Sequence, residues 1–247
     1  MNITDRDGYD NQPMFLPVSP ALLYTSIRAD GQADTYLYNW DEATTTQITI
    51  SAESEYSPTV MPDGHHFSVV RVEADSSQRL WQFTLDGSHP FLLLPEIKPV
   101  GYHAWGDENW VALFILGRPP SLQLANVSSG KSEKIAANIG RSLQKIPNQR
   151  AVSFVQKVSE KESWLKRLDI NTRKITPLIK TLPGSEDHTW TPDGTLLMAK
   201  DATLFKWHPQ KDEYWVEVKR FEQPGLQRIS RLAVSADGKK ITLVSNR

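Results

Sequence analysis

The stretch Val60-Met61-Pro62-Asp63-Gly64 decides the fold, because it returns twice along the chain. Its echoes are Trp190-Thr191-Pro192-Asp193-Gly194 and Val234-Ser235-Ala236-Asp237-Gly238. Each copy has an apolar residue two positions before Pro or Ala, followed by Asp-Gly. Gly accepts a positive φ, and Asp tolerates it and can bond the nearby backbone, so the pair closes a tight hairpin. The three copies therefore predict the same hairpin at three places.

Weaker copies fill the gaps between these three. They begin at Phe15, Trp105 and Lys145, so the six anchors stand at positions 15, 60, 105, 145, 190 and 234. A second landmark, an apolar residue before a turn, follows the same period at Trp40, Leu85, Val127, Leu168 and Trp207. The anchors are about 44 residues apart. A unit of about 44 residues holds four antiparallel strands, which make up one propeller blade. The sequence predicts an all-β fold, a six-bladed β-propeller of four-stranded antiparallel blades.

The repeat also resembles a known family. Residues 57–64, Ser-Pro-Thr-Val-Met-Pro-Asp-Gly, and residues 188–194 are similar to the TolB-like, WD40-like β-propeller repeat of bacterial proteins. Residues 10–15 resemble the start of another copy, and copies three and four lack the Pro-Asp-Gly turn. The resemblance covers nearly the whole chain. It implies a propeller that is often exported and often serves as a platform for protein contacts, and it implies no single activity.

The period predicts one propeller domain over residues 1–247. Its expected blades are 10–54, 55–99, 100–140, 141–184, 185–228, and 229–247 joined by 1–4. Six units of about 44 residues need more than 247 residues, so the closing blade is expected to be incomplete. We expect an N-terminal truncation, with an upstream segment that supplies a strand and carries an export signal. The alternative is a permanently open sixth blade.

Composition excludes several classes of function. The chain has 28 Lys plus Arg against 29 Asp plus Glu, which argues against nucleic acid as a partner. It has no Cys, so disulfides, thiolate metal sites and cysteine nucleophiles are excluded. No apolar run approaches the roughly 18 residues of a membrane span. The polar start of this chain contains no signal peptide, so a periplasmic or exported location is implied by the family resemblance alone. We expect a monomer.

Function in propellers usually lies on loops at the ends of the central channel. We expect the segments before the anchors to form such loops around one channel mouth. They are 10–13, 55–58, 100–103, 140–143, 185–188 and 229–232. The binding candidates among them are Asn11, Gln12, Tyr56, Tyr102, His103, Arg141, Glu186, Asp187, His188 and Arg231. Such side chains could hold a polar or anionic ligand, or the charged tip of a partner peptide, with Arg141 and Arg231 as donors. The alternative is that the mouth is polar only because it is exposed to solvent, and that it binds no ligand.

Two function hypotheses follow. The first is a non-catalytic binding platform that contacts a protein or peptide partner through the mouth, without a cofactor. The second is a lyase or hydrolase that acts on a polar substrate, with metal assistance. His103 and His188 share one repeat position and could join Glu186 or Asp187 at a metal, but no local ligand spacing supports it. The sequence has no Gly-x-Ser-x-Gly elbow and no phosphate-binding Gly-rich loop, so it nominates no catalytic residue.

Overall fold

The computed structural model describes residues 1–246, and all of its regular elements are β-strands. By packing, the chain divides into two compact units, Met1–Val100 and Gly101–Arg247. The prediction of a single domain over 1–247 stays a prediction. Residues 1–246 contain no helix long and apolar enough to cross a membrane.

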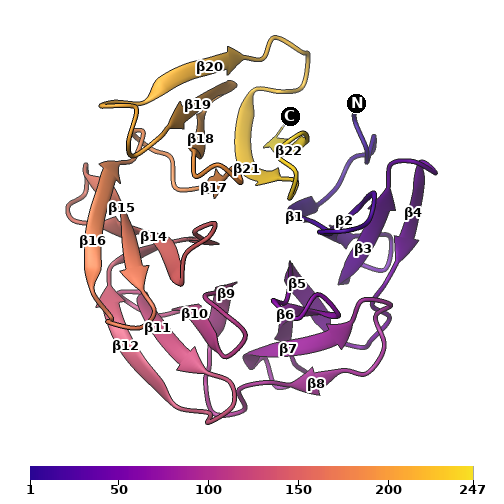
Figure 1. The fold of residues 1–247 in the computed structure, drawn as a ribbon. Coiled ribbons are helices and arrows are strands. Elements are labelled where there is room, and N and C mark those ends of the chain that lie inside the picture. The colour runs from indigo at the N-terminus through magenta and orange to yellow at the C-terminus, as the bar shows by residue number, and fades with distance from the viewer. Residues whose placement is uncertain (247) are drawn as a thin grey trace. The chain divides into compact units, whose positions relative to one another are not determined.

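The first unit contains two four-stranded antiparallel sheets, whose strands follow one another in chain order (Figure 1). One sheet comprises β1 (Asp10–Phe15), β2 (Ala21–Ile27), β3 (Ala33–Asn39) and β4 (Thr44–Gln47). The other comprises β5 (Ser54–Val60), β6 (His66–Val72), β7 (Gln78–Thr84) and β8 (Phe91–Leu92). Leu23, Phe67 and Val69 pack between the two sheets, and the rings of Phe67 and Phe83 stack 5.5 Å apart.

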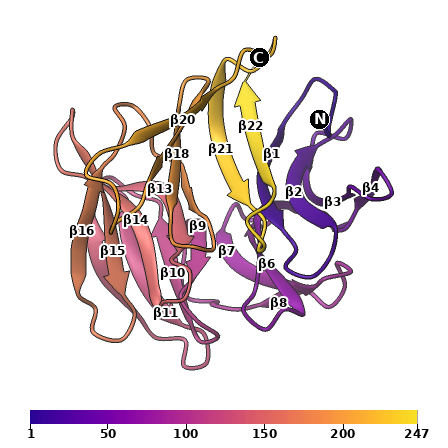
Figure 2. The same cartoon turned by 45° about the horizontal axis from the view of Figure 1, so that its top comes forward.

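The second unit contains three more four-stranded antiparallel sheets and one two-stranded sheet. The strands of the first two are β9 (Val100–Trp105), β10 (Trp110–Ile115), β11 (Ser121–Asn126), β12 (Ser132–Ala137), β13 (Ile139–Lys145), β14 (Ala151–Lys157), β15 (Ser163–Asp169) and β16 (Ile175–Lys180). The third has β17 (His188–Trp190), β18 (Leu196–Lys200), β19 (Thr203–Trp207) and β20 (Val216–Arg220). The last sheet has only β21 (Arg228–Val234) and β22 (Ile241–Asn246), which lie side by side in Figure 2.

Burial falls from the second strand of each four-stranded sheet to the fourth. The second strand β6 is buried at its five central positions, whereas the fourth strand β20 is exposed at all five. A strand that is covered on both faces reads as a continuous apolar run, and an outer strand can be polar. Between neighbouring sheets of the second unit lie apolar clusters, for example Val155, Trp190 and Met198.

The Asp-Gly hairpins form as predicted. Gly64, Gly194 and Gly238 have φ values of 69°, 82° and 71°, in the left-handed region that favours glycine. The Asp63 carboxylate accepts a bond from the His65 N–H at 2.8 Å, and Asp193 bonds the Thr195 N–H at 3.2 Å. The turn chemistry is local, which explains why the sequence reveals it.

The expected number of blades is wrong. Five sheets have four strands, not six, and the predicted closing blade is only the pair β21–β22 within the described residues. Residues 1–4, expected as part of its fourth strand, form no strand. The Asn2 side-chain oxygen instead accepts bonds from the Thr4 and Asp5 N–H groups at 3.4 and 3.3 Å. Such a local side-chain bond competes with strand pairing.

Candidate functional site: a pocket with excess positive charge

Most segments expected as mouth loops are in fact bulged strands. Residues 10–13, 55–58, 100–103, 140–143 and 229–232 lie within the first strand of their sheets, and only 185–187 precede theirs. The register shifts in four of these strands, between Asn11 and Met14 in β1 and at equivalent places in β5, β13 and β21. A bulge inserts an extra residue and re-aims side chains, so a polar, irregular segment can still belong to a strand. The expectation of loops is therefore corrected.

The three candidates in the first unit make contacts within that unit. The Gln12 side-chain oxygen accepts the Ser57 N–H at 3.0 Å, and Asn11 bonds the Gln12 N–H at 2.8 Å. The Tyr56 ring meets the Tyr9 ring edge-on, 6.5 Å between centroids. Gln12 and Ser57 both have positive φ, of 55° and 58°. These side chains therefore link the bulges of β1 and β5.

The second unit brings four candidates together in one pocket of about 690 Å³. The pocket takes residues from three consecutive sheets: the bulge of β13 and the end of β14, the segment before β17 and the end of β18, and the start of β21. Its charged lining residues are Arg141, Lys157, Lys200, Arg228 and Arg231 on the positive side and Glu186, Asp187 and Asp201 on the negative side. Five cations against three carboxylates leave an excess of two positive charges.

Asp187 is the centre of the ion pairs in this pocket. Arg231 Nη1 donates to Asp187 Oδ2 at 2.7 Å, and Arg141 Nη2 lies 3.7 Å from the same oxygen. Burial raises the pKa of Asp187, while the charges of Arg231 and then Arg141 act in the opposite direction. A neighbouring pair joins Lys157 to Glu186.

Arg231 is more buried than Arg141 and makes more contacts. The Arg231 side chain is only 13% exposed, also donates to the Ser230 carbonyl at 2.7 Å, and lies 5.8 Å from the Tyr102 ring centroid. Tyr102 thus adjoins the pocket through Arg231, as a cation–π contact. The Arg141 side chain is 48% exposed and its contact with Asp187 is long. Arg141 therefore keeps guanidinium donors available to an incoming group.

His188 is a structural residue of the core. Its ring nitrogens bond Ser142 Oγ at 3.0 Å and Ser153 Oγ at 2.8 Å, and Trp190 Nε1 donates to Ser153 Oγ at 2.8 Å. The residue is 1% exposed, and burial lowers the pKa of His188 to about 4, so its ring is neutral at pH 7.

His103 is buried as well, and burial lowers its pKa to about 3. Within residues 1–246, no three His, Cys, Asp or Glu side chains are placed to hold a metal ion. The described residues therefore do not fit the metal site that His103 and His188 were considered for.

The sequence reading missed Lys157 and Lys200, which line the pocket from the ends of β14 and β18. A usable signal existed, because each is the last residue of the second strand in its repeat. In an antiparallel hairpin the end of the second strand lies beside the start of the first. Each lysine therefore lies at the same end of its sheet as the mouth candidates.

Comparison with solved structures identifies the fold. A candidate TolB from Agrobacterium tumefaciens is similar, with a TM-score of 0.69 and 11% identity over 98% of this chain and 82% of that one. The fold is that of a TolB-like β-propeller. Other structures similar to this chain include enzymes. A gluconolactonase from Xanthomonas campestris has a TM-score of 0.75 and 8% identity over 99% of this chain and 85% of its own. An oligogalacturonate lyase in complex with manganese has a TM-score of 0.64 and 14% identity over 96% and 70%.

These identities are low, so they establish the propeller architecture alone. No protein-family model and no curated protein matches the sequence. Function has to be argued from the site.

Proposed function

We propose that this propeller is a non-catalytic binding platform, whose pocket around Asp187 receives an acidic group of a protein or peptide partner. The observation that carries the proposal is the excess of positive charge beside an arginine that is half exposed. A pocket with available guanidinium donors binds an anion in preference to a neutral group, because charge-assisted hydrogen bonds are stronger than neutral ones.

The different surroundings of Arg231 and Arg141 support this role. Asp187 and Tyr102 hold Arg231 in place, so Arg231 supplies a fixed positive charge. Arg141 meets the ligand carboxylate with its planar fork, while Lys200 and Arg228 add positive potential at the rim.

Binding of a short acidic peptide tests the proposal. The probe is tetraglutamate with an N-terminal fluorescein, compared with the matching tetraglutamine peptide by fluorescence anisotropy. We expect tetraglutamate to bind more tightly, and Arg141→Gln to weaken that binding about tenfold, the value of one charge-assisted bond.

Arg150→Gln is the matched control, since Arg150 is also about half exposed and pairs with an aspartate, Asp107, outside the pocket. Equal binding of the two peptides, or unchanged affinity of the Arg141 variant, would contradict the proposal.

A second candidate is a lyase that acts on an acidic sugar. An excess of positive charge suits a polyanionic saccharide as well as an acidic peptide, and one enzyme of similar fold is an oligogalacturonate lyase with manganese. Incubation with oligogalacturonate and Mn²⁺ separates the two, because elimination creates a carbon–carbon double bond that absorbs in the ultraviolet. The platform proposal expects no such absorbance to develop.

Export and the monomeric state belong to the same proposal. Export is supported by the family resemblance of the repeat. Fractionation of the source cells and light scattering of the purified chain test these two points.

A further inference from the structure

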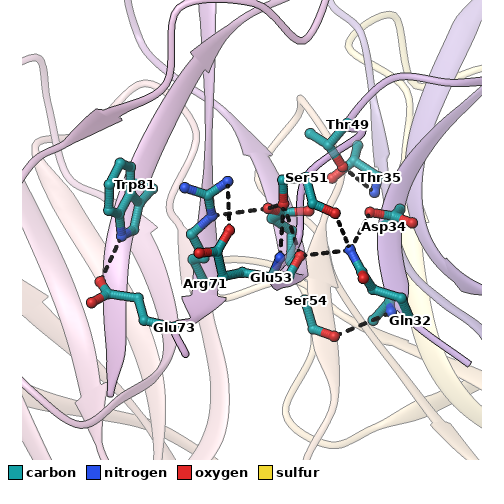
Figure 3. A network of polar contacts seen from close by, with 12 residues as sticks. Gln32, Asp34, Thr35, Thr49, Ser51, Glu53, Ser54, Arg71, Glu73 and Trp81 are labelled. Carbon is teal, nitrogen blue, oxygen red and sulfur yellow. Dashed lines mark hydrogen bonds and ion pairs between the residues drawn. The ribbon is translucent and has the colours of Figure 1, made fainter. Parts of the chain in front are cut away.

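Two carboxyl side chains of the first unit approach each other in its core. Asp34 lies on β3 and Glu55 on β5, in neighbouring sheets, and their residues are 2% and 0% exposed. Gln32 Nε2 lies 3.4 Å from Asp34 Oδ1 and 2.7 Å from the Ser51 carbonyl, and Ser51 Oγ donates to Glu55 Oε1 at 2.6 Å, so both carboxyl groups belong to one buried polar cluster. Figure 3 shows Asp34 within the polar network that runs from Gln32 to Arg71 and Trp81. Two buried carboxylates side by side repel each other unless one is protonated.

The donors around the pair are too few for two carboxylates. Glu55 Oε1 accepts from Ser51 Oγ at 2.6 Å and from Arg71 Nε at 3.0 Å, but Glu55 Oε2 is buried with no hydrogen-bond partner. A buried carboxylate oxygen without a donor carries a large desolvation cost. A protonated neighbouring carboxyl group would supply a donor to this oxygen.

Asp34 also receives little support as an anion. Gln47 Nε2 donates to it at 3.0 Å and also lies 3.1 Å from the Thr49 carbonyl. Gln32 Nε2 lies 2.7 and 2.9 Å from the carbonyls of Ser51 and Glu53, so its 3.4 Å contact with Asp34 is weak. A protonated Asp34 needs fewer donors and becomes one.

The charges facing the pair favour the same state. Glu55 and Asp30 face Asp34 with negative charge, and Glu53 faces the same guanidinium as Glu55. The positive charge beside Glu55 comes from Arg71, whose Nε lies 3.0 Å from Glu55 and whose Nη2 lies 3.5 Å from Glu53. One guanidinium therefore already pairs with two carboxylates. It also lies 4.6 Å from the Trp81 ring centroid, which fixes its position.

We propose that Asp34 and Glu55 share one proton, and that the resulting carboxyl–carboxylate hydrogen bond joins β3 to β5 and opens when the pH rises. Asp34 O–H donates to Glu55 Oε2, which satisfies the atom that otherwise lacks a partner. The bond links two blades of the first unit, independently of the pocket in the second unit.

The direction of the pH dependence follows from the titration. Burial, and then the charge of Glu55, raises the pKa of Asp34 from 3.8 to about 6. The folded chain therefore binds more protons than the unfolded chain between these values, and its stability falls as the pH rises through them. The stabilisation is complete below the ordinary Asp pKa and is lost above about pH 6. The ratio of folded to unfolded chain changes by at most about a hundredfold across this range.

The first test replaces the proton by a permanent donor. In Asp34→Asn the amide N–H takes the place of the carboxyl O–H. In the unaltered chain, we expect the deprotonation of Asp34 to lower the midpoint urea concentration as the pH rises from 4 to 6.5. Asp34→Asn is expected to remove this contribution. Asp86→Asn is the control, because the pKa of Asp86 is lowered to about 2 and lies outside this range. Identical pH profiles for the unaltered chain and Asp34→Asn would overturn the proposal.

The second test needs no folded Asp34 variant. Carboxyl ¹³C NMR of the unaltered chain is expected to show one Asp Cγ that titrates near pH 6, while Glu55→Gln moves that midpoint down by removing the neighbouring charge. If every Asp Cγ resonance titrates below about pH 4.5, within the ordinary range, the two residues share no proton.

Discussion

Arg231 donates a hydrogen bond to Asp187 across 2.7 Å, and the two residues occupy the same repeat position in consecutive blades. Each stands three residues before its anchor, Trp190 for one and Val234 for the other. One position of the repeat thus provides a carboxylate in one blade and its counter-ion in the next. The repeat places both residues at the same end of their sheets, and the opposite charges hold β21 to the segment before β17.

Asp187→Asn is expected to lower the free energy of unfolding by about 1–3 kcal/mol, because it leaves the largely buried Arg231 without its counter-charge. Urea denaturation at pH 7 measures the change. Asp237→Asn provides the comparison, since Asp237 pairs with Lys239 at 3.9 Å and both side chains are exposed. That variant is expected to stay near zero. Equal losses in the two variants would show that the Asp187–Arg231 pair has no special weight.

Reversal of charge at the rim tests the electrostatic part of the binding proposal. Lys200→Glu is expected to weaken tetraglutamate binding by about tenfold and to reduce its dependence on salt, because it removes positive potential from the pocket. Lys206→Glu, an exposed residue of β19 in the same sheet, carries the same charge change outside the pocket. A similar loss for both variants would mean that net charge alone, and not the pocket, governs binding.

Ser153, whose hydroxyl bonds both the His188 ring and the Trp190 ring, is expected to contribute to stability. Ser153→Ala removes the partner of His188 Nε2 and of Trp190 Nε1, both in the core, and should cost about 1–3 kcal/mol in thermal or urea denaturation. Ser128→Ala, at an exposed turn where Ser128 bonds Asn109, should cost much less. A negligible effect of Ser153→Ala would contradict the role of this hydrogen-bond chain.

His188 should also give the second unit a pH dependence opposite to that of Asp34. Burial lowers the pKa of His188 from 6.5 to about 4, so the unfolded chain binds more protons between these values. The stability from neutral His188 is present above about pH 6.5 and is lost as the pH falls through about 4. His188→Gln should remove this rise with pH, and Asp34→Asn should remove the fall, each in its own denaturation profile.

The turn at Gly194 offers a test of the repeat itself. Its φ of 82° strains any residue with a Cβ, although the space around the position is open. Gly194→Ala is therefore expected to cost about 1–2 kcal/mol, and Gly194→Asn less, because Asn tolerates this conformation. Thermal denaturation of the two variants checks the order, and a reversed order would exclude backbone strain as the cause.

The sequence by itself determined the hairpins and the period of the repeat, but not the number of four-stranded sheets. The Asp-Gly turns and the apolar second strands are encoded within a few residues, so a single copy of the motif carries its own hairpin, and the period follows from counting. The same counting placed Arg141, Glu186, Asp187 and Arg231 among ten candidates around one channel mouth, because equivalent positions of a repeat lie at equivalent ends of their sheets.

Only the tertiary structure decided which charges pair and which strands exist. The bulges that turn expected loops into strands depend on pairing with the second strand, and residues 1–4 find no strand to pair with among residues 1–246. The buried meeting of Asp34 and Glu55, and the neutral state of His188, arise from packing between sheets. Burial removes water from these groups, and desolvation is a property of the assembled core that no short stretch of sequence contains.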